Sequence, residues 1–244
     1  QGDFAISYYN NGIEKTLYCM FFGNSGNKKY LAPTLTVFDT YRHYAITRDG
    51  DNGNLKLYID GIDQNTPIAT YPNDPGTIFI ATGKIAIGRN IISSSDYFKG
   101  ELKHLRVYNK VKTQNEIQNS ITKLQNTAEN MFLNNSYYDL MVLYIKSDHV
   151  NNSTIFTDSS SHNNNINIFG NIHHSDNFNH INSSSIYFDG NGDYLTIPNS
   201  TDFNFGSYDF TIEFWFYTIH NSGNQTLLTN ATSSWVSQST WWIG

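Results

Sequence analysis

The chain has 244 residues and a formal net charge of −6; 15% of its residues are charged and 15% are aromatic. This charged share is low against about 25% in an average domain, and the length suits one large β-sandwich or two small domains. No dense Lys/Arg run is present, which argues against nucleic-acid binding, and no apolar stretch reaches the roughly 18–20 residues of a membrane helix. The single cysteine, Cys19, excludes an intrachain disulfide. Its apolar neighbours predict a buried, unreactive thiol.

Short apolar and aromatic runs, separated by turn signals, fill the first 108 residues. Many of the separators combine Asn, Asp and Gly, which tolerate left-handed backbone conformations in tight turns. Six runs are predicted strands: residues 4–9, 16–22, 42–47, 55–59, 85–88 and 102–108. This rhythm, without intervening helices, is typical of a β-sandwich or barrel.

One helix is predicted in mid-chain, over about residues 113–132. Thr113 and Glu116 form a capping box, in which each side chain accepts a backbone N–H at the helix start. Apolar residues then recur at helical spacing at positions 117, 121, 124 and 128, which predicts one face packed against the sandwich.

Strands resume after the helix. Residues 143–145 precede a long polar loop at 148–165, and the runs 185–188 and 194–197 flank an Asp-Gly-Asn-Gly-Asp turn. A final alternation of apolar and polar side chains covers residues 210–217 and predicts a half-buried strand. The two halves show no internal repeat.

Several ordered motifs resemble the laminin-G-like, or concanavalin-A-like lectin/glucanase, jelly-roll superfamily. Residues 185–198 and 210–215 are similar to the family's opening strands, and the Asp158-Ser159-Ser160 loop is similar to an early loop. Residues 41–50 and 55–61 are similar to the family's later Arg-Asp-Gly strand and hairpin. Further similar segments are the closing strands at 85–89 and 97–109, and the terminal short helix at Glu116-Ile117. The resemblance implies two antiparallel sheets forming a jelly roll.

The order of these motifs is reversed relative to the family. Residues 1–112 resemble the family's second half, 113–142 form a helix and connector, and 143–244 resemble its first half. One explanation is a single permuted sandwich over 1–244, because permutation is mild where the old ends lie close together. The alternative is two half-domains cut from a tandem array. Exchange of halves between chains is a variant of the first explanation and would allow self-assembly with neighbouring copies.

No catalytic residue is predicted. Glycosidases need two carboxyl groups about 5–10 Å apart. Asp209 and Glu213 share one face of a strand, but four residues separate their backbones by about 13 Å. His173, His174 and His180 are close together in sequence, but they lack zinc-site spacing and are expected in surface loops.

The resemblance implies a calcium site in a loop. Asp158 is the best candidate ligand, with Asn163, Asn164 or Asp189 as helpers, because hard cations prefer carboxylate and carbonyl oxygens. The alternative role for these side chains is to cap turns by bonding to their own backbone.

Three tryptophans, Trp235, Trp241 and Trp242, are candidate ligand contacts because aromatic faces anchor interfaces and stack on sugar rings. The sequence therefore predicts an all-β, non-catalytic recognition or adhesion module that binds glycan or protein. The resemblance implies an extracellular, cell-surface or virion-surface location. A purely structural shell, fibre or array subunit is the alternative, and a glucanase-like enzyme is a distant third.

Overall fold

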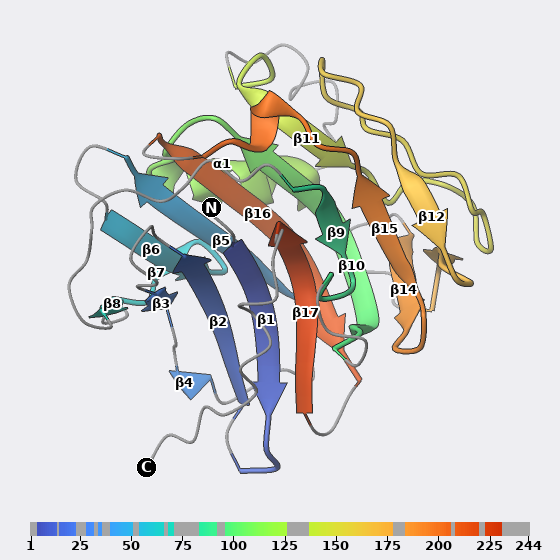
Figure 1. Cartoon of the computed structure of the whole chain (residues 1–244). Helices are drawn as coiled ribbons and strands as arrows, with labels where there is room; N and C mark the ends of the chain where they lie inside the picture. The colour runs from blue at the N-terminus through green and yellow to red at the C-terminus, as the bar shows by residue number, and fades with distance from the viewer. Residues whose placement is uncertain are drawn as a thin grey trace.

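Two antiparallel sheets packed face to face, with one helix outside them, make up the computed structural model in Figure 1. The structure describes residues 4–13, 15–22, 28–31, 34–35, 40–50, 54–65, 68–70, 83–91, 96–125, 137–177, 184–205, 208–219 and 223–230. This architecture is the predicted concanavalin-A-like jelly-roll sandwich. Among these residues no helix is long and apolar enough to cross a membrane.

The nine-stranded sheet begins with the short edge strand β12 and ends at β8. Its order is β12 (Asn167–Phe169), β15 (Tyr194–Ile197), β9 (Ile85–Ile87), β17 (Gly223–Asn230), β1 (Phe4–Asn10), β2 (Lys15–Phe22), β3 (Lys28–Leu31) and β8 (Ile68–Thr70), with β4 (Thr34–Leu35) beside β2.

The eight-stranded sheet carries the longest strands. Its order is β13 (His173–Ser175), β14 (Ser185–Asp189), β10 (Lys99–Tyr108), β16 (Phe210–Thr218), β5 (Arg42–Asp49), β6 (Asn54–Ile59) and β7 (Ile62–Asp63), with β11 (Met141–Ile145) beside β10. A short 3-10 helix, η1 (Thr201–Phe203), precedes β16. Every strand predicted from the sequence is present.

The core lies between the two sheets and follows the alternation of each strand. Phe210, Ile212, Phe214 and Phe216 of β16 point into it and are almost fully buried. The Phe216 ring meets Tyr8 of β1 edge-on, with ring centroids 6.5 Å apart. Cys19 is also fully buried there, and burial raises the pKa of its thiol. The expected inert cysteine is confirmed.

Helix α1 (Gln114–Gln125) covers the outer face of the eight-stranded sheet. The predicted capping box is confirmed: the Thr113 N–H donates to Glu116 Oε2 at 2.7 Å, and the Glu116 N–H donates to Thr113 Oγ1 at 3.4 Å. Ile117 is buried against Ala45 and Tyr58. The part of the predicted helix beyond residue 125 lies outside the described residues.

Both halves of the chain contribute to both sheets. In the middle of the nine-stranded sheet β17 lies between β9 and β1, and in the other sheet β16 lies between β10 and β5. The pairing of β1 with β17 is antiparallel and places Phe4 opposite Asn230. The predicted seam itself, residues 241–244 and 1–2, lies outside the described residues.

We propose that the chain is a circular permutant. A chain with its two halves in the family's order tests this proposal. A chain that runs from residue 137 to 244 and then from 1 to 125 is expected to form the same sandwich, because Asn230 and Phe4 are already neighbours. Near-UV circular dichroism, thermal unfolding and light scattering should match those of the present order, with a monomer in both. Failure of the reordered monomer to fold would instead favour half-domains cut from an array.

Candidate functional site

A buried ion cluster lies between β16 and helix α1. On β16, Glu213 points away from the core residues Ile212 and Phe214, toward the helix, because neighbouring side chains of a strand alternate between faces. Around it converge Lys112, from the segment before α1, and Arg106 of β10. The sequence thus brings one carboxylate and two cations together from distant segments.

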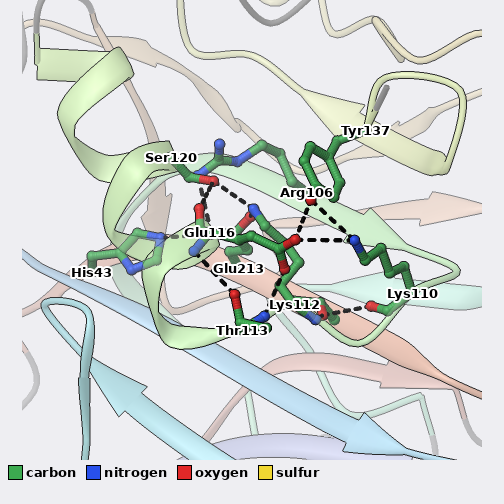
Figure 2. Close-up of polar contacts among 10 residues, drawn as sticks. His43, Arg106, Lys110, Lys112, Thr113, Glu116, Ser120, Tyr137 and Glu213 are labelled. Carbon is green, nitrogen blue, oxygen red and sulfur yellow. Dashed lines mark hydrogen bonds and ion pairs between the residues drawn. The ribbon is translucent and has the colours of Figure 1, made fainter. Parts of the chain in front are cut away.

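The contacts of Glu213 are short and closed to solvent. Its Oε1 pairs with Lys112 Nζ, and its Oε2 lies 3.6 Å from an Arg106 nitrogen and 3.3 Å from His43 Nε2 (Figure 2). The side chains of Glu213, Arg106 and His43 are fully buried. The His43 ring meets Trp215 edge-on, with centroids 5.3 Å apart. Glu213 is therefore an ion-paired structural group without a path to solvent.

The pKa values fit one carboxylate held by fixed positive charges. Burial alone raises the pKa of Glu213, but Arg106 and Lys112 outweigh it, and the pKa lies below its ordinary range. Burial lowers the pKa of His43 despite the neighbouring carboxylate, so its ring is neutral at pH 7. Burial likewise lowers the pKa of Lys112 to about 8, against the attraction of Glu213.

The cluster continues into the start of α1. Lys112 Nζ also donates to Ser120 Oγ, whose hydroxyl donates to the Glu116 carbonyl at 3.0 Å. Glu116 in turn pairs with Lys110 Nζ at 3.1 Å and accepts from the Tyr137 hydroxyl. Lys112 thus links Ser120 of α1 to Glu213 of β16. The contacts of Glu116 fix the start of α1 to the preceding segment, so the cluster holds α1 against the sheet.

Asp209 and Glu213, the two carboxyl groups considered for catalysis, make separate structural contacts. Asp209 Oδ1 accepts the N–H of Gly50 at 2.8 Å, where it closes the turn after β5, while Glu213 is sealed under α1. Within the described residues, no second carboxylate is among the contacts of Glu213.

Asp158, the best calcium candidate, is the hub of a hydrogen-bonded loop. Its Oδ1 accepts the N–H groups of Tyr144 and Ser160, each at 2.9 Å. Its Oδ2 accepts from the Ser160 hydroxyl and from both the backbone N–H and side-chain amide of Asn164, all at 2.8 Å. Asn164 therefore turns an N–H, not an oxygen, toward the carboxylate. Together these bonds close the loop onto β11.

Of the other calcium candidates, only Asn164 contacts Asp158 among the hydrogen bonds of the described residues, and it does so through N–H groups. Asp158 bridges to Ile145, which pairs with Leu105 near the middle of β10, whereas Asp189 pairs with Lys99 at the strand's start. Six residues of β10 correspond to roughly 20 Å. Asn163 has a φ of 49° and donates its N–H to the Ser160 carbonyl, so it forms part of a turn. No group of three metal-ligating side chains occurs among the described residues.

The remaining candidates have mixed outcomes. Trp235, Trp241 and Trp242 lie outside the described residues, as does His180. His173 and His174 are in β13, so their assignment to a surface loop is wrong. His174 is fully buried: its ring stacks on Phe156 at 4.7 Å, and its Nε2 lies 2.9 Å from the Ile155 carbonyl oxygen.

A stack of aromatic rings and one guanidinium lies at the β12 edge of the nine-stranded sheet. The rings of Phe169 and Tyr194 are parallel within 4°, with centroids 4.3 Å apart. The Arg89 guanidinium lies 4.6 Å from the Tyr194 centroid and 5.2 Å from that of Tyr97. The rings of Tyr97 and Tyr194 also meet directly, with centroids 6.4 Å apart, so Arg89 lies over both tyrosine rings and not between them. Phe169, on the other side of the pair with Tyr194, is 40% exposed.

Asp193 holds the two strands that carry the end of this stack. Its Oδ1 accepts the N–H of Asn171, after β12, and its Oδ2 accepts the N–H of Asp189, before β15. Gly170 makes the first contact possible: its φ is +80°, and a Cβ there would lie 2.2 Å from Asp193 Oδ1. Phe169 is thus fixed against Tyr194 by the backbone on both sides.

Sequence reasoning missed this stack because its four side chains come from four separate segments. One signal was present: residues 165–168 alternate between polar and apolar side chains shortly before Gly170, which is typical of a short strand.

Comparison with known proteins identifies one family. Residues 1–118, just under half of the chain, match a laminin-G-type family model described as the concanavalin A-like lectin/glucanases superfamily. Over these residues the chain is similar to this superfamily. No curated protein and no solved structure matches the chain. The match contains β1, β5, β10 and the start of α1. The concanavalin-A-like sandwich extends beyond it through the strands that the second half contributes.

Proposed function

We propose that the chain is a non-catalytic recognition module at an external surface and that its ligand is a carbohydrate. The similarity of residues 1–118 to the lectin/glucanase superfamily supports a binding module of this general kind. The sealed position of Glu213 supports a role without catalysis, because a general acid or base must be within hydrogen-bond reach of a substrate. Extracellular, cell-surface and virion-surface locations all agree with this role.

The aromatic stack at the β12 edge carries the proposal. Phe169 offers a ring whose inner face is occupied by Tyr194 and whose exposed fraction is 40%. Asn167 and Asn171, two positions before and after Phe169 in the chain, are exposed, as is Asn191 in the turn before β15, and their amides offer both donors and acceptors. An apolar ring face bordered by amides suits a pyranose, which presents C–H groups on one face and hydroxyls at its rim.

A protein ligand fits this place less well. The neighbouring large apolar side chain, Ile168, is also 40% exposed, but β12 has only three residues. Stable protein interfaces bury about 800 Å² on each partner, far more than two side chains supply. A three-residue edge likewise offers few backbone groups to an added strand.

The native chain is expected to bind carbohydrates on a glycan array. Phe169→Ala should weaken this binding at least tenfold, because a well-packed aromatic contact worth about 1.4 kcal/mol or more is lost. Phe169→Tyr should retain binding because the ring is kept. Tyr208→Ala is the matched control, since Tyr208 is 71% exposed and belongs to a different part of the surface. Binding that survives Phe169→Ala would move the ligand elsewhere, and a native chain that binds no glycan would reject the proposed function.

The alternative function is a structural subunit of a shell, fibre or array without a small ligand. The observation that favours it is the interleaving of the two halves in both sheets, because interleaved strands can join neighbouring copies. Growth of particle size with concentration in light scattering, together with absence of glycan binding, would support this alternative.

A further inference from the structure

Strands β16 and β17, here together called the wedge, lie in the middle of the two sheets, one in each. Residues 210–230 contain both strands, yet β16 lies between β10 and β5 while β17 lies between β9 and β1. All four neighbours come from residues 4–125. Among the described residues neither strand pairs with a strand from its own half of the chain, so the backbone pairing of this wedge comes from the other half.

The wedge supplies a large part of the core. Phe214 stacks on Tyr44 of β5 with centroids 6.1 Å apart, and Phe216 is tilted against the same ring at 4.6 Å. Phe216 also meets Phe98 edge-on at 6.3 Å. Without the wedge, residues 4–125 would expose these aromatic faces together with the unpaired backbone edges of four strands. Such open edges are templates for pairing with another chain.

The polar face of the wedge makes the fit selective. Glu213 is the carboxylate that Arg106 and Lys112 hold beneath α1. Two positions earlier, Thr211 Oγ1 accepts the Lys112 N–H at 2.9 Å and donates to the Lys110 carbonyl at 2.6 Å. An occupant with another sequence would leave the two cations buried without a counter-charge, which is strongly unfavourable. The gaps that the wedge fills, between β10 and β5 and between β9 and β1, are here called the slots. They therefore require the same wedge, from this chain or from another copy.

We propose that residues 4–125 of one copy accept the wedge of a second copy, so that neighbouring copies join by exchanging halves. The same pairings form in either case, and closure within one chain is favoured only by the covalent connection through residues 126–136. A connection of this kind corresponds to an effective concentration on the order of millimolar. Closure between copies becomes comparable when the copies are held at about that concentration, as in an array. The proposal does not depend on a carbohydrate ligand.

A pair of solvent-facing cysteines tests the exchange. Tyr9 of β1 is opposite Asn224 of β17, and the exposed fraction is intermediate for Tyr9 and high for Asn224. Full-length Tyr9→Cys and Asn224→Cys chains, each also carrying Cys19→Ala and a tag of different size, are refolded together under oxidising conditions. We expect a disulfide between the two chains, increasing about tenfold for each tenfold rise in concentration in the dilute range.

Two controls decide the result. A chain with both Tyr9→Cys and Asn224→Cys should form the bond within itself at low concentration; its failure would refute the β1–β17 pairing on which the proposal rests. Tyr9→Cys refolded with Tyr208→Cys gives the random background, because Tyr208 does not pair with β1. Cross-linking of the first pair no greater than this background, at concentrations near millimolar, would overturn exchange between copies.

Discussion

Replacing Glu213 by Gln is expected to lower the free energy of unfolding by about 3–5 kcal/mol, because two cations would remain buried without their carboxylate. The change keeps the size of the side chain, so the loss measures charge and not packing. Lys112 and Arg106 have no route to water under α1, since both are at most 2% exposed. Chemical denaturation of both proteins at pH 7 is the measurement.

Two matched variants separate this effect from a general loss of charge. Glu116→Gln removes a carboxylate from the same cluster, but its side chain is 21% exposed, and we expect a loss of only about 1 kcal/mol through the weakened helix cap. Adding Lys112→Met to Glu213→Gln should recover part of the lost stability, because one uncompensated charge is removed. Strictly additive losses in the double variant would contradict the cluster.

The effect of Glu213→Gln should also depend on pH in one direction. The pKa of Glu213 is below its ordinary value in the folded protein, so its contribution is fully present above the unfolded pKa of about 4.3. That contribution is lost as the pH falls through the folded pKa. The stability difference between native and variant chains should therefore be constant from pH 7 to about pH 5 and shrink at lower pH. A difference that grows on acidification would be inconsistent with this assignment.

Replacing Asp158 by Ala is expected to cost about 2–4 kcal/mol, because the N–H groups of Tyr144, Ser160 and Asn164 would lose their acceptor in a largely buried loop. Asp158→Asn should lose less, since its remaining carbonyl oxygen still accepts. Asp202→Ala, at a partly exposed turn, is a control for removal of a carboxylate, and we expect less than about 1 kcal/mol there.

The same variants test calcium. Both Asp158 oxygens already accept protein donors, so we expect the midpoint of thermal unfolding to be equal in calcium and in EDTA for the native chain. A higher midpoint in calcium that disappears in Asp158→Asn would instead assign the loop as a calcium site.

The sequence predicted the fold well because its signals are local. Alternation in residues 210–217 and the capping box at Thr113 and Glu116 specify strand and helix without reference to the rest of the chain. Seven described strands were missed: six are short, namely β3, β4, β7, β8, β12 and β13, and the seventh, β17, is rich in Asn, Thr and Gln. β17 is nevertheless central, because its neighbours supply the apolar surroundings that its own sequence lacks.

The candidate site was much less predictable. Phe169, Tyr194 and Arg89 come together only through the pairing of β12 with β15 and of β15 with β9, which no local pattern specifies. The sequence placed Glu213 too far from Asp209 for catalysis, but nothing near Glu213 in sequence indicates Lys112 or Arg106 as partners. The alternation of side chains along β16 could be read from the local sequence, whereas the ionic partners of Glu213 depend on how distant strands are arranged in the sheet.

The pairing of β1 with β17 also has a kinetic consequence. The Thr229 hydroxyl donates to the Phe4 carbonyl across 225 positions of sequence. Folding rates fall as contacting residues lie further apart along the chain, since the entropy of closing the loop is lost before the contact forms. In the present order nearly the whole chain must collapse before its two central strands meet, so we expect slow folding and long exposure of the β16–β17 wedge. A newly synthesised copy would then meet its neighbours while its central slots are still open.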